Sequence, residues 1–197
     1  MSDDANDDQL LIARAQRGER AGFDALVRKH QERAYVYAFR LTRDSDVAAD
    51  VVADAFLRIH NALPNFKGQS SFKTWLYRIL TNCYLDLRKR ERARPHGSLD
   101  AMMDVGEGES GAQFADDRPN PEEEAQSRAR GDAMQAALAA MPEYQRAMIV
   151  MYHAEDMSYE EMAAALDLPV GTVKSRLNRA RLNLRDGLLR HEELFRR

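Results

Sequence analysis

Apolar residues recur every three or four positions along most of this chain, which is the spacing of one face of an α-helix. The pattern follows a short acidic tail and covers residues 10–30, 33–42, 46–63 and 71–92, and it returns from about residue 128. Gly18 and Gly22 indicate a break between two helices in the first of these ranges. No stretch alternates like a half-buried strand, so the sequence predicts an all-α fold.

The clearest helix of the first half is predicted over residues 71–92. Its apolar stripe comprises Phe72, Trp75, Leu76, Ile79, Leu80, Cys83 and Leu87. Trp75 is therefore expected in the core. The polar residues that lie away from this stripe are Lys73, Thr74, Tyr77, Arg78, Thr81 and Arg88, with Asn82 near its edge. This polar side is predicted to be an exposed binding surface.

Helical periodicity disappears between residues 94 and 127, where Pro, Gly, Ser, Asp and Glu predominate. A chain of this composition buries too little apolar surface to offset its ordering entropy. The sequence therefore predicts two small helical domains, residues 8–93 and 128–191, joined by a flexible acidic linker over residues 94–127.

The second domain contains a predicted helix-turn-helix over residues 158–184. Ser158 and Glu161 have the spacing of a capping box, and Leu168-Pro169 ends the first short helix where a second one begins. Val173, Leu177, Ala180 and Leu184 make the packing stripe of the second helix, whereas Ser175, Asn178 and Arg179, flanked by Lys174 and Arg176, point the other way. Arginine and asparagine suit base reading and lysine suits phosphate, so this face is typical of a DNA-reading helix. The alternative is an ordinary solvated basic face.

Composition and charge narrow the class of protein, its compartment and the cofactors to be expected. The 197 residues include 29 Lys and Arg against 32 Asp and Glu, with the basic residues gathered in two blocks and the acidic ones between them. The single cysteine, Cys83, excludes an internal disulfide and favours the cytosol. The five histidines form no metal-binding cluster, and no cofactor or membrane-inserted segment is expected.

Two segments carry a family resemblance. Residues 157–162 and 170–181 closely resemble region 4 of bacterial extracytoplasmic-function (ECF) sigma factors, and residues 66–82, with the run Thr-Trp-Leu-Tyr-Arg-Ile, resemble region 2 of the same family. Two signatures in the family's order are more specific than either alone. The resemblance implies a protein that binds core RNA polymerase and promoter DNA to start transcription.

The resemblance also implies site residues. In region 4, recognition of the upstream (minus-35) promoter element would fall to Thr172, Lys174, Ser175, Arg176, Asn178 and Arg179. In region 2, capture of the melted non-template strand at the minus-10 element would fall to Phe66, Lys67, Gly68, Gln69, Ser70, Ser71, Lys73, Tyr77, Arg78, Asn82 and Arg88. Phe66 and Phe72 fit both base stacking and anchoring of the loop in the core.

Residues 46–57 resemble the helix by which region 2 grips the polymerase. Ala49 and Ala53 replace glutamate and glutamine of the usual pattern, so those contacts are absent. The expected polymerase-binding residues are Asp46, Asp50, Val52, Phe56 and Arg58, although periodicity makes Phe56 equally a core residue. The family further implies an inhibitory anti-sigma partner, which would hold a cytoplasmic protein at the membrane, and a linker that enters the polymerase's RNA path. A passive solvated tether is the alternative for the linker.

Two other functions remain to be weighed. A stand-alone helix-turn-helix regulator would explain residues 158–184 but not residues 66–82. A hydrolase using His153, Glu155 and Asp156 would lack a nucleophile and a metal-ligand set, so the sequence predicts that this protein is not an enzyme.

Overall fold

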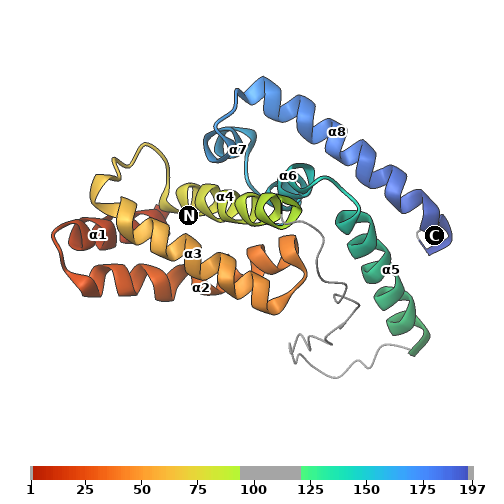
Figure 1. Cartoon of the computed structure of the whole chain (residues 1–197), viewed down its shortest axis with the longest axis horizontal. Helices are drawn as coiled ribbons and strands as arrows, with labels where there is room; N and C mark the ends of the chain where they lie inside the picture. The colour runs from red at the N-terminus through yellow and green to blue at the C-terminus, as the bar shows by residue number, and fades with distance from the viewer. Residues whose placement is uncertain (1, 94–120, 195–197) are drawn as a thin grey trace.

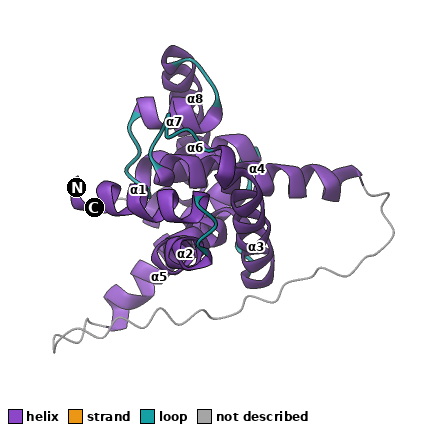
Figure 2. Ribbon diagram, turned by 90° about the vertical axis from the view of Figure 1, so that its left-hand side faces the viewer, coloured by secondary structure: helices purple, strands orange, loops and turns teal. Residues whose placement is uncertain are grey.

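The computed structural model of this chain describes residues 2–93 and 121–194. Within those ranges the chain forms eight α-helices and two short 3-10 helices, and they contain no strand (Figures 1 and 2). The predicted all-α fold is therefore confirmed.

The first module, residues 2–93, is a helical bundle. Its elements are α1 (Ser2–Gln16), α2 (Arg20–Thr42), α3 (Ser45–Ala62), the 3-10 helix η1 (Leu63–Asn65) and α4 (Phe72–Ala93), with α2 packed against α1, α3 and α4. Gly18, at φ +86°, marks the break between α1 and α2. Gly22 is not a break. It lies inside α2, where a Cβ atom would stand 2.7 Å from the backbone N of Ala15, so it allows the close approach of α1 and α2.

The second module, residues 121–194, comprises α5 (Pro121–Ala139), α6 (Glu143–His153), α7 (Tyr159–Leu166), α8 (Val170–Leu188) and the 3-10 helix η2 (Leu189–Leu194). Residues 121–127, which the sequence predicts in the linker, belong to α5. Proline followed by three glutamates suits a helix start, because proline has no N–H to leave unpaired and carboxylates favour the helix N-terminus. The rest of the predicted linker, residues 94–120, lies outside the described residues.

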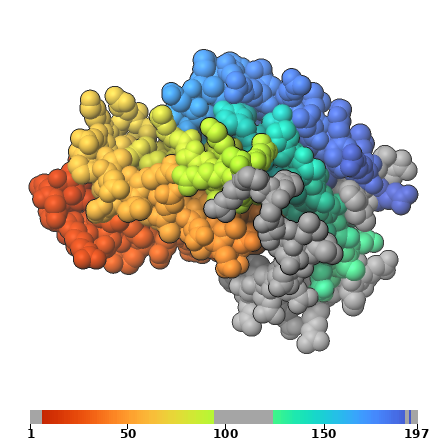
Figure 3. Space-filling view, in the orientation of Figure 1, coloured from red at the N-terminus to blue at the C-terminus, as the bar shows by residue number. Residues whose placement is uncertain are grey.

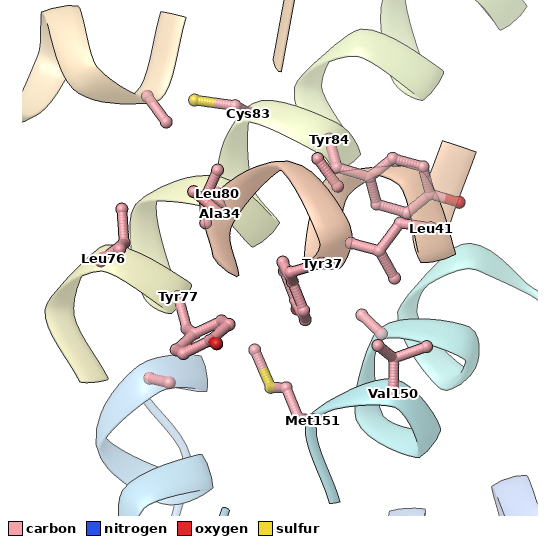
Figure 4. Packing of buried hydrophobic residues seen from close by; sticks show 14 of the residues in the cluster. Ala34, Tyr37, Leu41, Leu76, Tyr77, Leu80, Cys83, Tyr84, Val150 and Met151 are labelled. Carbon is pink, nitrogen blue, oxygen red and sulfur yellow. The ribbon is translucent and has the colours of Figure 1, made fainter. Parts of the chain in front are cut away.

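The two modules pack on each other and share one hydrophobic core. Tyr37 of α2, Tyr77 of α4 and Met151 of α6 face one another in it, and all three are at most 1% exposed (Figure 4). Helix α7 lies against α4, and α6 lies against α2. In the space-filling view, α4 and the helices of the second module form a continuous surface (Figure 3). The two predicted helical domains are therefore present, and in this arrangement they are packed against each other.

A buried arginine joins the ends of two helices at this junction. Arg146, at the start of α6, is 5% exposed. Its guanidinium donates hydrogen bonds to the backbone oxygens of Leu138 (2.8 Å) and Ala139 (2.6 Å) in the last turn of α5. A third bond, of 2.8 Å, reaches the oxygen of Leu41 in the last turn of α2, in the other module. A cation is favourable at helix C-termini, where carbonyl groups lack intrahelical partners.

Candidate nucleic-acid interface

The helix-turn-helix is formed by α7 and α8. The Ser158 hydroxyl accepts a hydrogen bond from the Glu161 backbone N (3.1 Å), and the Glu161 carboxylate accepts one from the Ser158 backbone N (2.9 Å). The predicted capping box is thus confirmed. Helix α7 ends at Leu166, and the left-handed φ of +54° at its C-cap, Asp167, turns the chain toward Pro169 and α8. These local signals place the second helix as the sequence predicts, although it extends four residues further, to Leu188.

Helix α8 separates its apolar and polar residues as predicted. Val173, Leu177 and Ala180 are fully buried against the module. Thr172 is half-buried, and the exposed residues are Lys174, Ser175, Arg176, Asn178 and Arg179. The six predicted upstream-element residues therefore lie together near the N-terminal end of one helix. An exposed helix face of this kind fits the major groove, where side chains meet base edges.

Aromatic rings flank the cations of this face, a feature that the sequence analysis missed. The Lys174 ammonium lies 5.4 Å from the ring centroid of Tyr159, which stacks on Tyr152 at 5.4 Å. The Arg181 guanidinium lies 4.5 Å from the Tyr152 ring centroid. Cation–π contacts of this geometry restrict where a flexible cation points. Hydrogen bonding to Tyr152, and then to Arg181, lowers the pKa of Tyr159.

The predicted strand-capturing loop connects η1 to α4 and is fixed at both ends. The Phe66 ring stacks on Trp75 with centroids 4.3 Å apart, and Phe72 is 3% exposed, so both anchor the loop. Gln16, which the sequence analysis did not single out, donates hydrogen bonds to the backbone oxygens of Leu63 (3.0 Å) and Phe66 (2.8 Å). The Ser71 hydroxyl accepts one from the Thr74 backbone N at the start of α4.

Between these anchors the loop tip is open. Lys67, Gly68 and Gln69 are exposed, and Gly68 adopts a left-handed φ of +67°. Beside the tip lies a hollow of about 630 Å³. Lys67, Gln69, Ser70 and Arg78 line it from the first module, and Asp167, directly after α7, lines it from the second. Its volume lies within the roughly 300–1,000 Å³ of typical ligand pockets, which is ample for one nucleobase.

The polar face of α4 differs from the prediction. Thr74, Tyr77 and Thr81 are at most 3% exposed, so their placement on an exposed face is wrong. Tyr37 of α2 contacts Thr81 and Tyr77, and Glu155 of the second module contacts Tyr77. Packing on other helices therefore buries this side of α4 in a way that the periodicity of a single helix does not reveal. The Tyr77 hydroxyl donates to the Glu155 carboxylate, and burial raises the pKa of this phenol.

The other predicted strand-binding residues of α4 vary in exposure. Lys73 is half-buried and donates to the Glu155 backbone oxygen (3.3 Å), and Arg78 is exposed beside the Asp167 carboxylate (3.7 Å). Asn82 is exposed. Arg88, at the far end of the helix, is half-buried and pairs with Glu91 (2.6 Å). Their side chains lie along one helix but do not form one open surface.

The predicted polymerase-binding residues of α3 separate into two groups. Asp46 and Asp50 are exposed and Val52 is half-buried, so these three lie at the surface. Phe56 is 8% exposed and belongs to the core. Arg58 bridges the carboxylates of Asp54 and Asp86, each at 2.9 Å, and these hydrogen bonds raise its pKa.

An apolar groove between α2 and α3 was not anticipated from the sequence. Phe23, Val27 and Leu57 line it together with His60, and Leu57 is 61% exposed. Helical periodicity does not predict this groove, because Leu57 lies next to the core stripe of α3 and so cannot be told apart from a core residue by its spacing.

Residues 2–93 and 121–194 contain no cluster of three metal-ligating side chains. The residues of the hydrolase alternative do not converge, since the Glu155 carboxylate accepts a hydrogen bond from Tyr77 whereas His153 accepts one from Arg181 (3.3 Å). None of the helices searched in residues 2–93 and 121–194 has the length and apolar character needed to cross a membrane.

Comparison with known proteins covers both modules. The family model described as Sigma-70 region 2 matches residues 26–94, and the model described as Sigma-70, region 4 matches residues 131–184. The chain is 36% identical over 174 residues to the ECF RNA polymerase sigma-E factor of Escherichia coli (strain K12), a match that spans 88% of this chain and 90% of that protein. It is 34% identical over 191 residues to the ECF RNA polymerase sigma factor SigE of Mycolicibacterium smegmatis, spanning 96% of this chain and 70% of that protein.

Two solved structures are similar across both modules. CnrH, in complex with the cytosolic domain of CnrY, is 26% identical with a TM-score of 0.64, over 92% of this chain and 97% of that one. The sigma factor RpoE, in complex with the anti-sigma factor NepR from Bartonella quintana, is 26% identical with a TM-score of 0.58, over 84% of this chain and 96% of that one. Because both sigma regions match in order, and because the relatives align along most of their length, this chain belongs to the ECF sigma factors, which are transcription initiation factors and not enzymes.

Proposed function

We propose that the chain divides promoter recognition between its two modules while it is bound to core RNA polymerase. The exposed face of α8 would read the upstream element as duplex DNA, with Arg179 and Asn178 at base edges and Lys174 on phosphate. The loop at Lys67–Ser70 would take up a flipped base of the non-template strand, and α4 would hold that strand electrostatically.

One observation carries the proposal. A single chain contains both an exposed basic recognition face on α8 and a glycine-containing loop beside a hollow lined by polar and apolar groups. Duplex reading and base capture are different physical tasks, and a stand-alone helix-turn-helix regulator needs only the first. Both Sigma-70 regions match, which also disfavours that alternative.

The surface of α3 is the proposed polymerase contact. Asp46, Asp50 and Val52 supply its accessible side chains, whereas Phe56 would support the helix from the core and the half-buried Arg58 would support it through its ion pairs with Asp54 and Asp86. Since Ala49 and Ala53 are both exposed and carry no polar group, the contact depends on fewer side chains than the family pattern provides.

Regulation by an anti-sigma factor is proposed from the relatives. RpoE of Bartonella quintana has been solved with the anti-sigma factor NepR. By analogy, this chain would act in the cytoplasm and could be retained at the membrane through such a partner.

Run-off transcription tests the proposal. Purified chain is mixed with core RNA polymerase and a genomic promoter library, and transcript start sites are mapped. We expect specific initiation only when both proteins are present. Equal transcription without the chain, or none from any promoter with it, would refute the proposed function.

A further inference from the structure

The turn between α6 and α7 inserts an acidic residue against the first module. Glu155 retains only 10% side-chain exposure. One carboxylate oxygen accepts a hydrogen bond from the Arg40 guanidinium (2.7 Å), and the other accepts one from the Tyr77 hydroxyl. Arg40 also donates to the Ala154 backbone oxygen (3.3 Å), and Lys73 donates to that of Glu155 (3.3 Å). Two cations and a phenol of the first module thus converge on one turn of the second.

The surroundings of this turn are strongly charged. A hollow of about 470 Å³ beside it is lined by Arg33, Arg40 and Lys73 from the first module and by Glu155 and Asp156 from the second. A second acidic contact lies farther along α4, where Asp167 at the end of α7 approaches Arg78. Acidic side chains of one module therefore neutralise cations along the same side of the other.

The cations that contact Glu155 and Asp167 include two proposed to hold the melted strand, Lys73 and Arg78. Arg78 faces the Asp167 carboxylate, and Lys73 donates to the backbone oxygen of Glu155. A phosphate diester also accepts hydrogen bonds from guanidinium and ammonium groups, so it competes with these oxygens for the same donors. Arg40 of α2 belongs to the same surface, although nothing in the α4 sequence motif points to it.

We propose that the Glu155 turn and Asp167 occupy the strand-binding surface of the first module, and that Arg40 is a further contact to the single strand. The packed arrangement is then a closed state that excludes melted DNA, and the strand competes with the second module for Arg40, Lys73 and Arg78. This inference rests on the proposed function and adds its regulation.

The substitution Glu155→Gln keeps the shape of the side chain but removes its charge. Hydrogen bonds to charged groups contribute more than neutral ones, by an amount that corresponds to about a tenfold change in an equilibrium constant. The closed-to-open ratio should fall by about that factor. Since apparent affinity scales with the open fraction, affinity for single-stranded DNA should rise by up to the same factor.

The test uses the full chain with two fluorescent labels, attached through Arg20→Cys on α2 and Asp186→Cys on α8, both exposed positions. The buried Cys83 thiol is retained. Energy transfer reports module separation, and fluorescence anisotropy reports binding of a random-sequence single-stranded DNA. The matched control is Glu32→Gln, which removes a carboxylate from the same hollow, where Glu32 is exposed.

Glu155→Gln should lower energy transfer and tighten DNA binding by more than about twofold and up to about tenfold, whereas Glu32→Gln should leave energy transfer unchanged and alter affinity less than about twofold. Arg40→Gln breaks the same pair from the other side. It should also lower energy transfer but should bind DNA more weakly than Glu155→Gln, because it removes a strand contact. Circular dichroism establishes that each variant is folded.

The inference is overturned if Glu155→Gln matches Glu32→Gln in both readouts. It is also overturned if Glu155→Gln opens the modules without tightening DNA binding, since the covered surface is then not the strand site. Run-off transcription separates this failure from failure of the proposed function. If the wild-type chain initiates normally with core polymerase but Glu155→Gln and Glu32→Gln do not differ, the proposed function stands and only the closed state is refuted.

Discussion

Replacing the buried Arg146 should destabilise the fold more than any surface charge change. Arg146→Met keeps most of the side-chain volume but removes the donors to the backbone oxygens of Leu138, Ala139 and Leu41. Each of these bonds involves a charged donor, and each carbonyl left without a partner inside the protein costs about 1–3 kcal/mol. The substitution also removes the desolvation cost of the buried guanidinium, which offsets part of the loss from the three unpaired carbonyls. The free energy of unfolding should therefore fall by about 3–5 kcal/mol.

Urea unfolding followed by circular dichroism measures this loss. The matched control is Arg185→Met, which breaks a surface pair between Arg185 and Asp186 whose side chains are 64% and 58% exposed. It should change the unfolding free energy by less than about 1 kcal/mol. Arg146→Lys should fall between the two, because an ammonium retains the charge but not the planar array of donors. A loss below about 1 kcal/mol for Arg146→Met would refute the assigned role of Arg146 at the two helix ends.

Three further predictions concern the interface and the core. Arg179→Ala should weaken binding of the upstream element by about 1–3 kcal/mol and relax the sequence preference there, whereas Lys174→Ala should weaken binding uniformly across sequences. Competition assays with base-substituted duplexes measure both effects, and an unchanged sequence preference in both variants would contradict the assignment. The double substitution Gln69→Ala and Ser70→Ala leaves Ser71, which caps α4, intact. It should impair initiation on duplex promoters more than on templates with a pre-melted bubble, and equal defects on both templates would favour a general binding role. Burial raises the pKa of the Cys83 thiol to about 12, so at pH 8 a thiol reagent should modify the native protein far more slowly than the urea-unfolded chain; equal rates would contradict the buried placement.

Local signals predicted the helix-turn-helix well. The capping box at Ser158, the proline before α8 and the helical stripe of Val173, Leu177 and Ala180 all act within a few residues of chain, so they can be recognised without tertiary information. The exposed polar face of α8 followed directly from that stripe.

Tertiary packing accounts for what the sequence did not reveal. The periodicity of α4 assigned Tyr77 to an exposed face, but the second module buries it, and that contact is made by Glu155, which is distant in sequence. The buried role of Arg146 left no signal in the sequence, because its carbonyl partners come from two other helices. Residues that bond across modules leave no periodic trace.

The division of labour between the modules is the central claim, and site-specific photo-crosslinking tests it most directly. A photoreactive residue is placed at position 69 in one variant and at position 179 in another, and each is assembled with core RNA polymerase on a promoter identified by run-off transcription. We predict that position 179 crosslinks to upstream duplex, that position 69 crosslinks to the non-template strand of a separate downstream segment, and that the downstream crosslink requires core polymerase. Crosslinks from both positions to the same duplex segment, unchanged when polymerase is omitted, would contradict the account.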